Sequence, residues 1–364
     1  MNKKYIFLYF IIIIMIILSG NTYKKININR DNYNGQRIVR ASEYLIIRAN
    51  QDNINNYKNG NKFDMYTFND NDITNYRYIG NEANNYIYFN CSNISDTSTC
   101  ELWRIIGVFK VENSYLKNQY RIKIMKDEPI NSIKWGSNNN FNDSNIKKYL
   151  NNGEFYYSLK GKAKNMIDTT KYYLGGIDNI GNGSTLYGLE HSNNTYNNYP
   201  YDFYGMIGLI TPSDYSYTFA YNYDNECYNN IYSCNNNSWM KFKSSTWTMI
   251  PSSKSNTVYT VGDNSKDHNP NELLDIYPVF YLKYDTVIEG GNGSSVDPYI
   301  IRALSTSDIQ NESDLVNAGD KSIIDVDDTA SSLSIALLVI SFTVIGSGIV
   351  IFMISFVKSR RELR

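Results

Sequence analysis

The sequence is poor in the residues that carry most metal and nucleophilic chemistry. It has two histidines, His191 and His268, and four cysteines, none of them spaced as CxxC. Zinc sites need closely spaced cysteine or histidine ligands, so no zinc site is expected. The GxSxG and HExxH motifs are also missing, and both histidines lie in polar segments. No catalytic residue is therefore predicted.

Positive charge is scarce once the two ends of the chain are set aside. The net charge is −1, the tail 358–364 carries +3, and Lys3 with Lys4 carries +2, so residues 5–357 carry −6. Proteins that bind nucleic acids present basic patches to the phosphate backbone. The acidic central region argues against a nucleic-acid partner.

The chain has two long apolar runs, and the first lies at its N-terminus. Residues 5–18 follow two lysines and precede Ser19 and Gly20. A basic start, an apolar stretch of this length and small residues after it are typical of a signal peptide. We expect a signal peptide over 1–20, with an uncleaved signal anchor as the alternative.

The second apolar run covers 333–357 and contains no charged residue. At about 1.5 Å per residue it is long enough to cross a hydrocarbon core of roughly 30 Å. The basic tail 358–364 follows it, and the positive-inside rule assigns such a tail to the cytoplasm. The sequence therefore predicts a single-pass protein of the cell membrane with its N-terminal region outside.

Outside the cell, an even number of cysteines in two local pairs indicates disulfides. The pairs are Cys91 with Cys100 and Cys227 with Cys234. This local pairing is the simplest of three possible connectivities. The residues between Cys91 and Cys100 are polar and lie between two apolar segments, which predicts a disulfide-closed loop between two strands.

The pattern between the two apolar runs predicts an α+β domain. An irregular polar segment is expected over 21–75, apart from a short helix or strand at 41–50. The domain follows over 76–302, and an acidic stalk over 303–332 connects it to the membrane.

Three segments near the start of this domain read as strands: 86–90, 101–111 and 120–126. Their short connections predict an antiparallel meander. In the third segment Arg121, Lys123 and Met125 alternate with Ile122, Ile124 and Lys126, which predicts one buried and one solvent-facing side. Trp103 is expected in the core, and Arg104 on a polar face or in a buried pair.

Two helices are predicted next. Asp143 or Ser144 can cap the first, which has apolar residues at i, i+3 and i+4 and ends near Gly153. Apolar residues at helical spacing from Phe155 to Met166 predict the second. A long loop rich in Gly, Asn and Tyr is expected over 177–238, and long loops of this kind often carry function.

The last part of the domain returns to strand-like sequence. The segments TWTMIPSS, TVYTVG and IYPVFYLK read as strands, and the glycines at 290–293 predict a hairpin turn.

Eight stretches between about residues 76 and 301 carry a family resemblance: YRYIGNEANNYIYFN, ELWRIIGVF, SNIKKYLNNGEFYYSLKGKAKNMI, KYYLGG, IGLITPSDY, WTMIPSS, YPVFYL and GGNGSSVDPYII. In sequence and in order they resemble a family of secreted or surface-anchored proteins of low-GC Gram-positive bacteria. The family is similar in turn to C-type-lectin-like folds, the group that includes formylglycine-generating enzymes.

The resemblance implies a C-type-lectin-like ectodomain of antiparallel strands with two helices, here followed by one transmembrane helix. It transfers no catalytic residue. Related sequences usually have Arg-Pro in the last core strand, where this chain has Tyr277-Pro278. The copper-binding cysteines of formylglycine-generating enzymes have no match among the loop cysteines.

The first functional hypothesis is a cell-surface binding or adhesion protein that presents a Tyr/Asn-rich loop face to a glycan or protein. Tyrosine rings would stack on the ligand and asparagine amides would form hydrogen bonds. A membrane-tethered hydrolase or modifying enzyme and a structural envelope protein without a ligand are the alternatives. The candidate ligand residues are Tyr196, Tyr199, Tyr201, Tyr204, Tyr215, Tyr217 and Trp239.

No cofactor is expected, apart from a weak resemblance to a calcium loop. Asp263, Ser265 and Asp267 have the spacing with which a calcium loop begins. The segment lacks the central glycine and the terminal glutamate of an EF-hand. An acidic extracellular loop of this kind is more often simply solvated.

Overall fold

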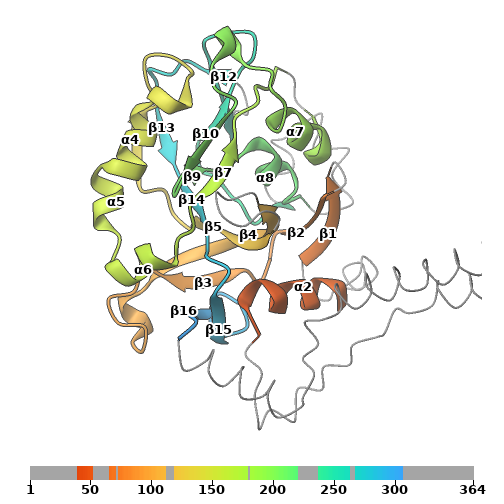
Figure 1. Cartoon of the computed structure of the whole chain (residues 1–364), viewed down its shortest axis with the longest axis vertical. Helices are drawn as coiled ribbons and strands as arrows, with labels where there is room; N and C mark the ends of the chain where they lie inside the picture. Colours follow the sequence, from red (N-terminus) through yellow and green to blue (C-terminus); the bar gives the residue numbers. More distant parts are fainter. Residues whose placement is uncertain are drawn as a thin grey trace, which may run out of the picture. The chain divides into compact units, whose positions relative to one another are not determined.

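Figure 1 shows the computed structural model of the chain. It describes residues 39–51, 65–70, 73–111, 119–178, 181–219, 237–262 and 267–305. Within these ranges no helix is long and apolar enough to span a membrane. The predicted signal peptide, transmembrane run and basic tail all lie outside the described residues, as does the stalk beyond residue 305.

The fold is α+β with mostly antiparallel sheets, and its largest sheet has seven strands in the order β1-β2-β4-β5-β14-β9, with β3 paired to β4. The strands are β1 (Met65–Asp70), β2 (Ile73–Tyr78), β3 (Tyr86–Phe89), β4 (Glu101–Val111), β5 (Gln119–Lys126), β9 (Gly208–Leu209) and β14 (Pro278–Tyr281). All pairs in this sheet are antiparallel. The predicted meander of three strands is confirmed as β3, β4 and β5.

A second sheet has five strands in the order β12-β11-β10-β13-β6, and two strand pairs stand apart from both sheets. The sheet consists of β6 (Asn131–Lys134), β10 (Thr246–Pro251), β11 (Val258–Val261), β12 (Asp267–His268) and β13 (Leu273–Ile276). The separate pairs are β7 (Thr170–Tyr173) with β8 (Asp202–Gly205), and β15 (Thr286–Gly290) with β16 (Ile300–Ala303). The last pair is the predicted glycine hairpin, in which Gly291 and Gly293 have positive φ.

The helices are short. They are α2 (Ala41–Gln51), α4 (Asn145–Asn152), α5 (Glu154–Ser158), α6 (Gly161–Met166), α7 (Gly183–Glu190) and α8 (Pro212–Ser216), with single 3-10 turns η1 (Thr97–Thr99), η2 (Phe141–Asp143) and η3 (Tyr196–Asn198). Ser144 caps α4 as predicted, because its side chain accepts a hydrogen bond from Lys147 N. The predicted second helix is divided into α5 and α6, since Leu159 and Lys160 have extended backbone.

Two segments expected to be irregular contain regular structure. Within 21–75 lie β1 and the start of β2, and β2 pairs directly with β4, while the short helix or strand expected at 41–50 is helix α2. In Figure 1, α2 lies at the bottom of the view beside the β15–β16 pair. Within 177–238 lie α7, β8, β9 and α8. Regular structure therefore begins well before residue 76, and the described part of the predicted long loop contains several short elements.

The loop between β3 and β4 is closed by the predicted disulfide, Cys91–Cys100. Cys227 and Cys234 lie outside the described residues. Behind the loop, Trp103 is fully buried, as predicted. Arg104 is also buried and forms an ion pair with Asp127 at 3.5 Å.

The prediction of a solvent-facing side for 120–126 is wrong, because both sides of β5 are covered. Arg121 and Lys123 are 2% and 4% exposed. Arg121 Nε donates to Asp168 Oδ2 at 2.7 Å, and Lys123 Nζ donates to Asp214 Oδ2 at 2.5 Å. The alternation of the strand is real, but its second side carries buried cations with carboxylate partners.

Gly107 of β4 lies between two buried cations. The register pairs it with Arg77 of β2 on one side and with Lys123 of β5 on the other, next to a register shift after Ile105. A Cβ atom at Gly107 would lie 2.1 Å from the carbonyl oxygen of Tyr76. The close approach of β2 to β4 therefore requires glycine at this position.

We expect Gly107→Ala to lower the free energy of unfolding by about 2–4 kcal/mol, because the β2 backbone must move away from β4. Urea denaturation at 25 °C measures the change. Gly161→Ala is the matched control, since a Cβ there meets no atom within 4 Å and the position is the first residue of α6. It should leave stability unchanged or raise it by up to about 1 kcal/mol. Equal losses in the two variants would contradict the structural role of Gly107.

Candidate functional site

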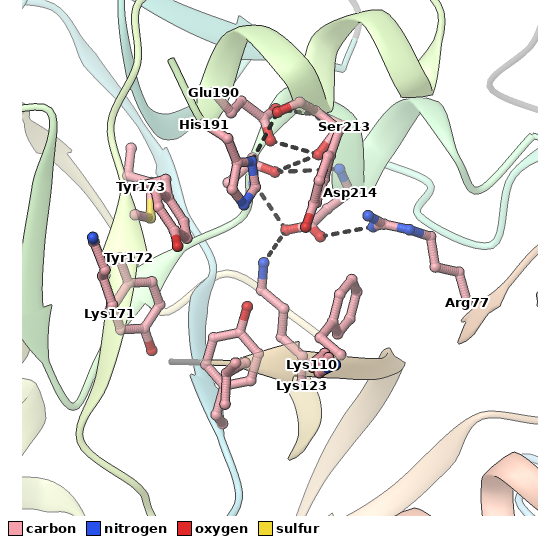
Figure 2. A pocket seen from close by; sticks show the side chains of 16 residues that line it. Arg77, Lys110, Lys123, Lys171, Tyr172, Tyr173, Glu190, His191, Ser213 and Asp214 are labelled. Atoms are coloured by element: carbon pink, nitrogen blue, oxygen red, sulfur yellow. Dashed lines mark hydrogen bonds and ion pairs between the residues drawn. The ribbon is translucent and has the colours of Figure 1, made fainter. Parts of the chain in front are cut away.

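A cavity of about 50 Å³ lies where α7, α8 and the β7–β8 pair meet the large sheet. Figure 2 shows the side chains that line it. Charged residues from β2, β4, β5 and β7 contribute to the lining, together with polar residues from α7 and α8. The volume is room for a few water molecules or for the end of a larger ligand.

Asp214 of α8 is the centre of the polar lining. Its Oδ2 atom accepts a hydrogen bond from Lys123 Nζ at 2.5 Å, and its Oδ1 atom lies 3.5 Å from Arg77 Nη1. The three side chains are between 2% and 5% exposed. Figure 2 shows the two cations reaching the carboxylate from different strands. The carboxylate and its two cationic partners compensate charges that would be costly to bury alone.

The sequence T-P-S-D at 211–214 explains why Asp214 is in this position. Thr211 is the N-cap of α8, Pro212 is the first helical residue, and Asp214 completes a capping box with Thr211. Thr211 N donates to Asp214 Oδ2 at 3.0 Å, and Asp214 N donates back to Thr211 Oγ1 at 3.3 Å. The capping box and the ion pairs thus use the same carboxylate.

Glu190, the last residue of α7, lines the cavity and binds its neighbour in the lining, Ser213. Its Oε1 and Oε2 atoms accept hydrogen bonds from Ser213 N at 2.7 Å and from Ser213 Oγ at 2.5 Å. The side chain is buried, and this burial raises the pKa of Glu190 to about 7, with the charge of Asp214 acting in the same direction and the Ser213 hydrogen bonds opposing it. Glu190 therefore gains or loses its proton close to neutral pH.

His191 lies between two tyrosine rings. Its ring centroid is 4.0 Å from that of Tyr173 and 3.9 Å from that of Tyr187. Nδ1 lies 2.8 Å from the carbonyl oxygen of Tyr187, and because a carbonyl oxygen only accepts, Nδ1 carries the proton in the neutral ring. We call Tyr173, His191 and Tyr187 the aromatic stack. Lys171 Nζ lies 5.0 Å from the ring of Tyr173, and Arg77 Cζ lies 5.4 Å from the ring of Tyr187.

The β7–β8 ribbon, Thr170–Tyr173 with Asp202–Gly205, lines part of the cavity through β7 and also faces outward. Tyr172 and Phe203 are paired on its inner side, where their rings stack at 4.9 Å. Lys171 pairs with Tyr204 on the outer side, and its ammonium lies 3.1 Å from Asp202 Oδ2. The ribbon thus joins the core to an exposed polar and aromatic surface.

The seven aromatic residues predicted to contact a ligand divide into two groups. Four lie in the segment 196–205, which runs from η3 through β8: Tyr201 and Tyr204 are 46% and 49% exposed, while Tyr196 and Tyr199 are half-buried. The others pack inward, with Tyr215 and Trp239 in the core and Tyr217 half-buried against the Arg77 guanidinium at 4.3 Å.

The predicted calcium segment is only partly described. Asp267 lies in β12, where its Oδ2 atom accepts a hydrogen bond from Thr257 Oγ1 at 3.1 Å, and Asp263 lies outside the described residues. Among the residues that the structure describes, no three His, Cys, Asp or Glu side chains are grouped to hold a metal ion.

Sequence reasoning missed four of the residues that line the cavity: Arg77, Lys123, Glu190 and Asp214. The sequence analysis assigned His191 neither a metal-binding nor a catalytic role. The capping-box pattern at 211–214 is a local signal for Asp214. The partners are 137 residues away for Arg77 and 91 for Lys123, and such distant pairs leave no mark on local periodicity.

Comparison with known proteins finds no matching protein-family model, no similar curated protein and no similar solved structure. The function is therefore inferred from the residues of the site.

We expect Asp214→Asn to lower the free energy of unfolding by about 3–5 kcal/mol, because it removes the buried negative charge that both Arg77 and Lys123 contact. Urea denaturation at pH 7 measures the loss. Asp202→Asn removes the partner of Lys171 at a site where the carboxylate is 30% exposed, and should cost at most about 1 kcal/mol. Similar losses in both variants would contradict the central role of Asp214.

The Glu190 proton predicts a dependence of stability on pH. The pKa of this group is raised from 4.5 to about 7 in the folded protein, so the folded state binds the proton more tightly than the unfolded state does. This contribution is fully present below pH 4.5 and is lost as pH rises through about 7. The slope reaches at most about 1.4 kcal/mol per pH unit.

Glu190→Gln should remove this slope between pH 5 and 7, since glutamine does not titrate and still offers an acceptor to Ser213 N. Thermal and urea unfolding across that range measure the effect. Glu272→Gln is the control, because hydrogen bonds from His268 and from Asn269 N lower the pKa of Glu272. A slope that persists in Glu190→Gln would rule out Glu190 as its source.

Proposed function

We propose that the chain is a single-pass membrane-anchored cell-surface protein whose ectodomain binds an extracellular glycan or protein. The observation that carries the proposal is the exposure of Tyr204 on β8 and of Tyr201 just before it, because the partner strand β7 lines the polar cavity. The Cys91–Cys100 disulfide supports an extracellular location. The predicted signal peptide over 1–20 and apolar run over 333–357 supply the route to the membrane.

The ribbon is suited to binding because its tyrosines stand on a supported scaffold. The inner side chains Tyr172 and Phe203 are 4% and 5% exposed and hold the ribbon against the core. Tyrosine rings on such a base provide contact area at a low cost in conformational entropy. Sugar rings or the aliphatic parts of a peptide can lie on these faces, while the phenol groups form hydrogen bonds.

The proposal includes the C-type-lectin-like fold implied by the family resemblance. Its support is the combination of mostly antiparallel sheets with helices α4 to α6 between β6 and β7. Folds of this class place variable connecting segments around a fixed set of strands, which suits a binding role.

The alternative of a membrane-tethered hydrolase would need a free acid, base or nucleophile in the cavity. Both oxygens of Glu190 accept hydrogen bonds from Ser213, and the Asp214 carboxylate is engaged by Lys123, Arg77 and Thr211. These groups are committed to holding the lining in place. Ligand binding fits the arrangement better than catalysis does, and better than a structural envelope protein without a ligand.

A glycan array and a cell-wall pull-down with the full-length chain in detergent test the proposal. We expect a retained ligand, and a loss of about tenfold or more in affinity when Tyr201 and Tyr204 are both replaced by alanine, because each ring supplies about 1 kcal/mol of contact. Tyr157→Ala is the control: this tyrosine is 71% exposed but lies on α5, outside the ribbon.

Retention that is unaffected by the double replacement would reject the ribbon as the binding surface. No retained ligand under any condition would favour the structural alternative, and turnover of a bound glycan would favour the hydrolase.

A further inference from the structure

The lining of the cavity has an excess of positive charge, although the whole chain carries −1. Four cationic side chains, Arg77, Lys110, Lys123 and Lys171, face two carboxyl groups, Glu190 and Asp214. The excess is two positive charges, or one when the ion pair of Lys171 with Asp202 is included. A concave site with charge of one sign attracts ligands of the other.

Lys123 is the innermost cation with spare hydrogen-bonding capacity. Its ammonium has three N–H donors, and the side chain is only 5% exposed. Among the described residues, Asp214 accepts one hydrogen bond from it, and the rings of Phe109 and Tyr281 lie 5.4 and 5.5 Å away. Buried donors usually have acceptors in folded proteins. The two remaining N–H groups of Lys123 can therefore donate to oxygen atoms that enter the cavity.

Two further lysines stand at the opening. Lys110 lies near the end of β4 and is exposed; within the part of the chain that the structure describes, its ammonium has no ion pair. Lys171 lies on β7, in the ribbon that also carries Tyr204. An anionic group attached to a ligand on the ribbon would therefore meet Lys171 first and Lys123 further in.

We propose that the cavity is a subsite for the carboxylate of an acidic sugar, with Lys123 as the inner contact and Lys110 and Lys171 at the opening. This inference rests on the proposed binding function of the ribbon. The exposed tyrosines favour a saccharide, because sugar rings stack on aromatic faces. The small volume of about 50 Å³ favours a planar carboxylate over the bulkier sulfate or phosphate group.

Titration calorimetry of the full-length chain in detergent tests the subsite with a matched pair of sugars, glucuronate and glucose. We expect glucuronate to bind at least about tenfold more tightly than glucose, and the difference to shrink as salt is added. Glucose 6-sulfate is the third ligand and should bind more weakly than glucuronate.

Three variants identify the residues. Lys110→Gln should weaken glucuronate binding by about three- to tenfold, and Lys123→Met should weaken it more. Lys110 is exposed, so its variant is informative even where Lys123→Met lowers stability. Glu190→Gln removes a negative charge from the lining and should strengthen binding. Lys243→Gln is the control, since this lysine is 86% exposed and pairs with Glu128 away from the cavity.

Equal binding of glucuronate and glucose would overturn the subsite and leave the binding function of the ribbon intact. The subsite would also be overturned if neither Lys110→Gln nor Glu190→Gln changed the affinity for glucuronate. Glucose 6-sulfate binding as tightly as glucuronate, or more tightly, would overturn it too. Binding of none of the three sugars overturns the subsite as well, and the array with the tyrosine variants then decides separately whether the ribbon binds another ligand.

Discussion

The buried carboxylate of Asp214 holds together parts of the chain that have little else in common. It receives Arg77 from β2 and Lys123 from β5, two strands that flank β4 at Gly107. Helix α8, which supplies it, has five residues, and a helix of that length is not stable on its own. The ion pairs and the capping box therefore fix α8 on the sheet, and α8 in turn supplies a negative charge to the two buried cations.

The polar lining continues outward from this centre as an unbroken set of hydrogen bonds. Thr211 Oγ1 and Ser213 Oγ lie 3.0 Å apart, and Ser213 in turn binds Glu190 of α7. Well-packed apolar residues often stabilise a fold as much as buried ion pairs do, so stability alone does not explain such a network. A polar network beside a small cavity keeps that cavity hydrated and receptive to a polar group, which is what a binding subsite needs.

Local pattern predicts the parts of the fold that rest on local rules. Strands β3 to β5, the Ser144 cap and the glycine hairpin at 290–293 follow from alternation, capping and turn chemistry. Strands β1 and β2 were missed because MYTFND and ITNYRY are polar; β1 pairs with β2, and β2 joins the sheet by pairing with β4. The burial of the polar side of β5 was missed for a related reason. Alternation of residue types distinguishes the two sides of a strand, but it does not show whether a carboxylate from a distant part of the chain covers the polar side.

The same limit explains how the tyrosines divide between core and surface. Abundant tyrosine suggests a recognition surface but does not show which tyrosines are exposed. Tyr215 is 1% exposed, while Tyr204, eleven positions earlier, is 49% exposed. The deciding element is the ribbon, whose inner pair Tyr172 and Phe203 turns Tyr204 outward. The aromatic stack then runs from Tyr173 on that ribbon through His191 to Tyr187, next to Arg77. The aromatic stack thus connects the ribbon to the buried charged residues. A ligand that combines a flat ring with one anionic group would contact the ribbon with its ring and the charged residues with its anion.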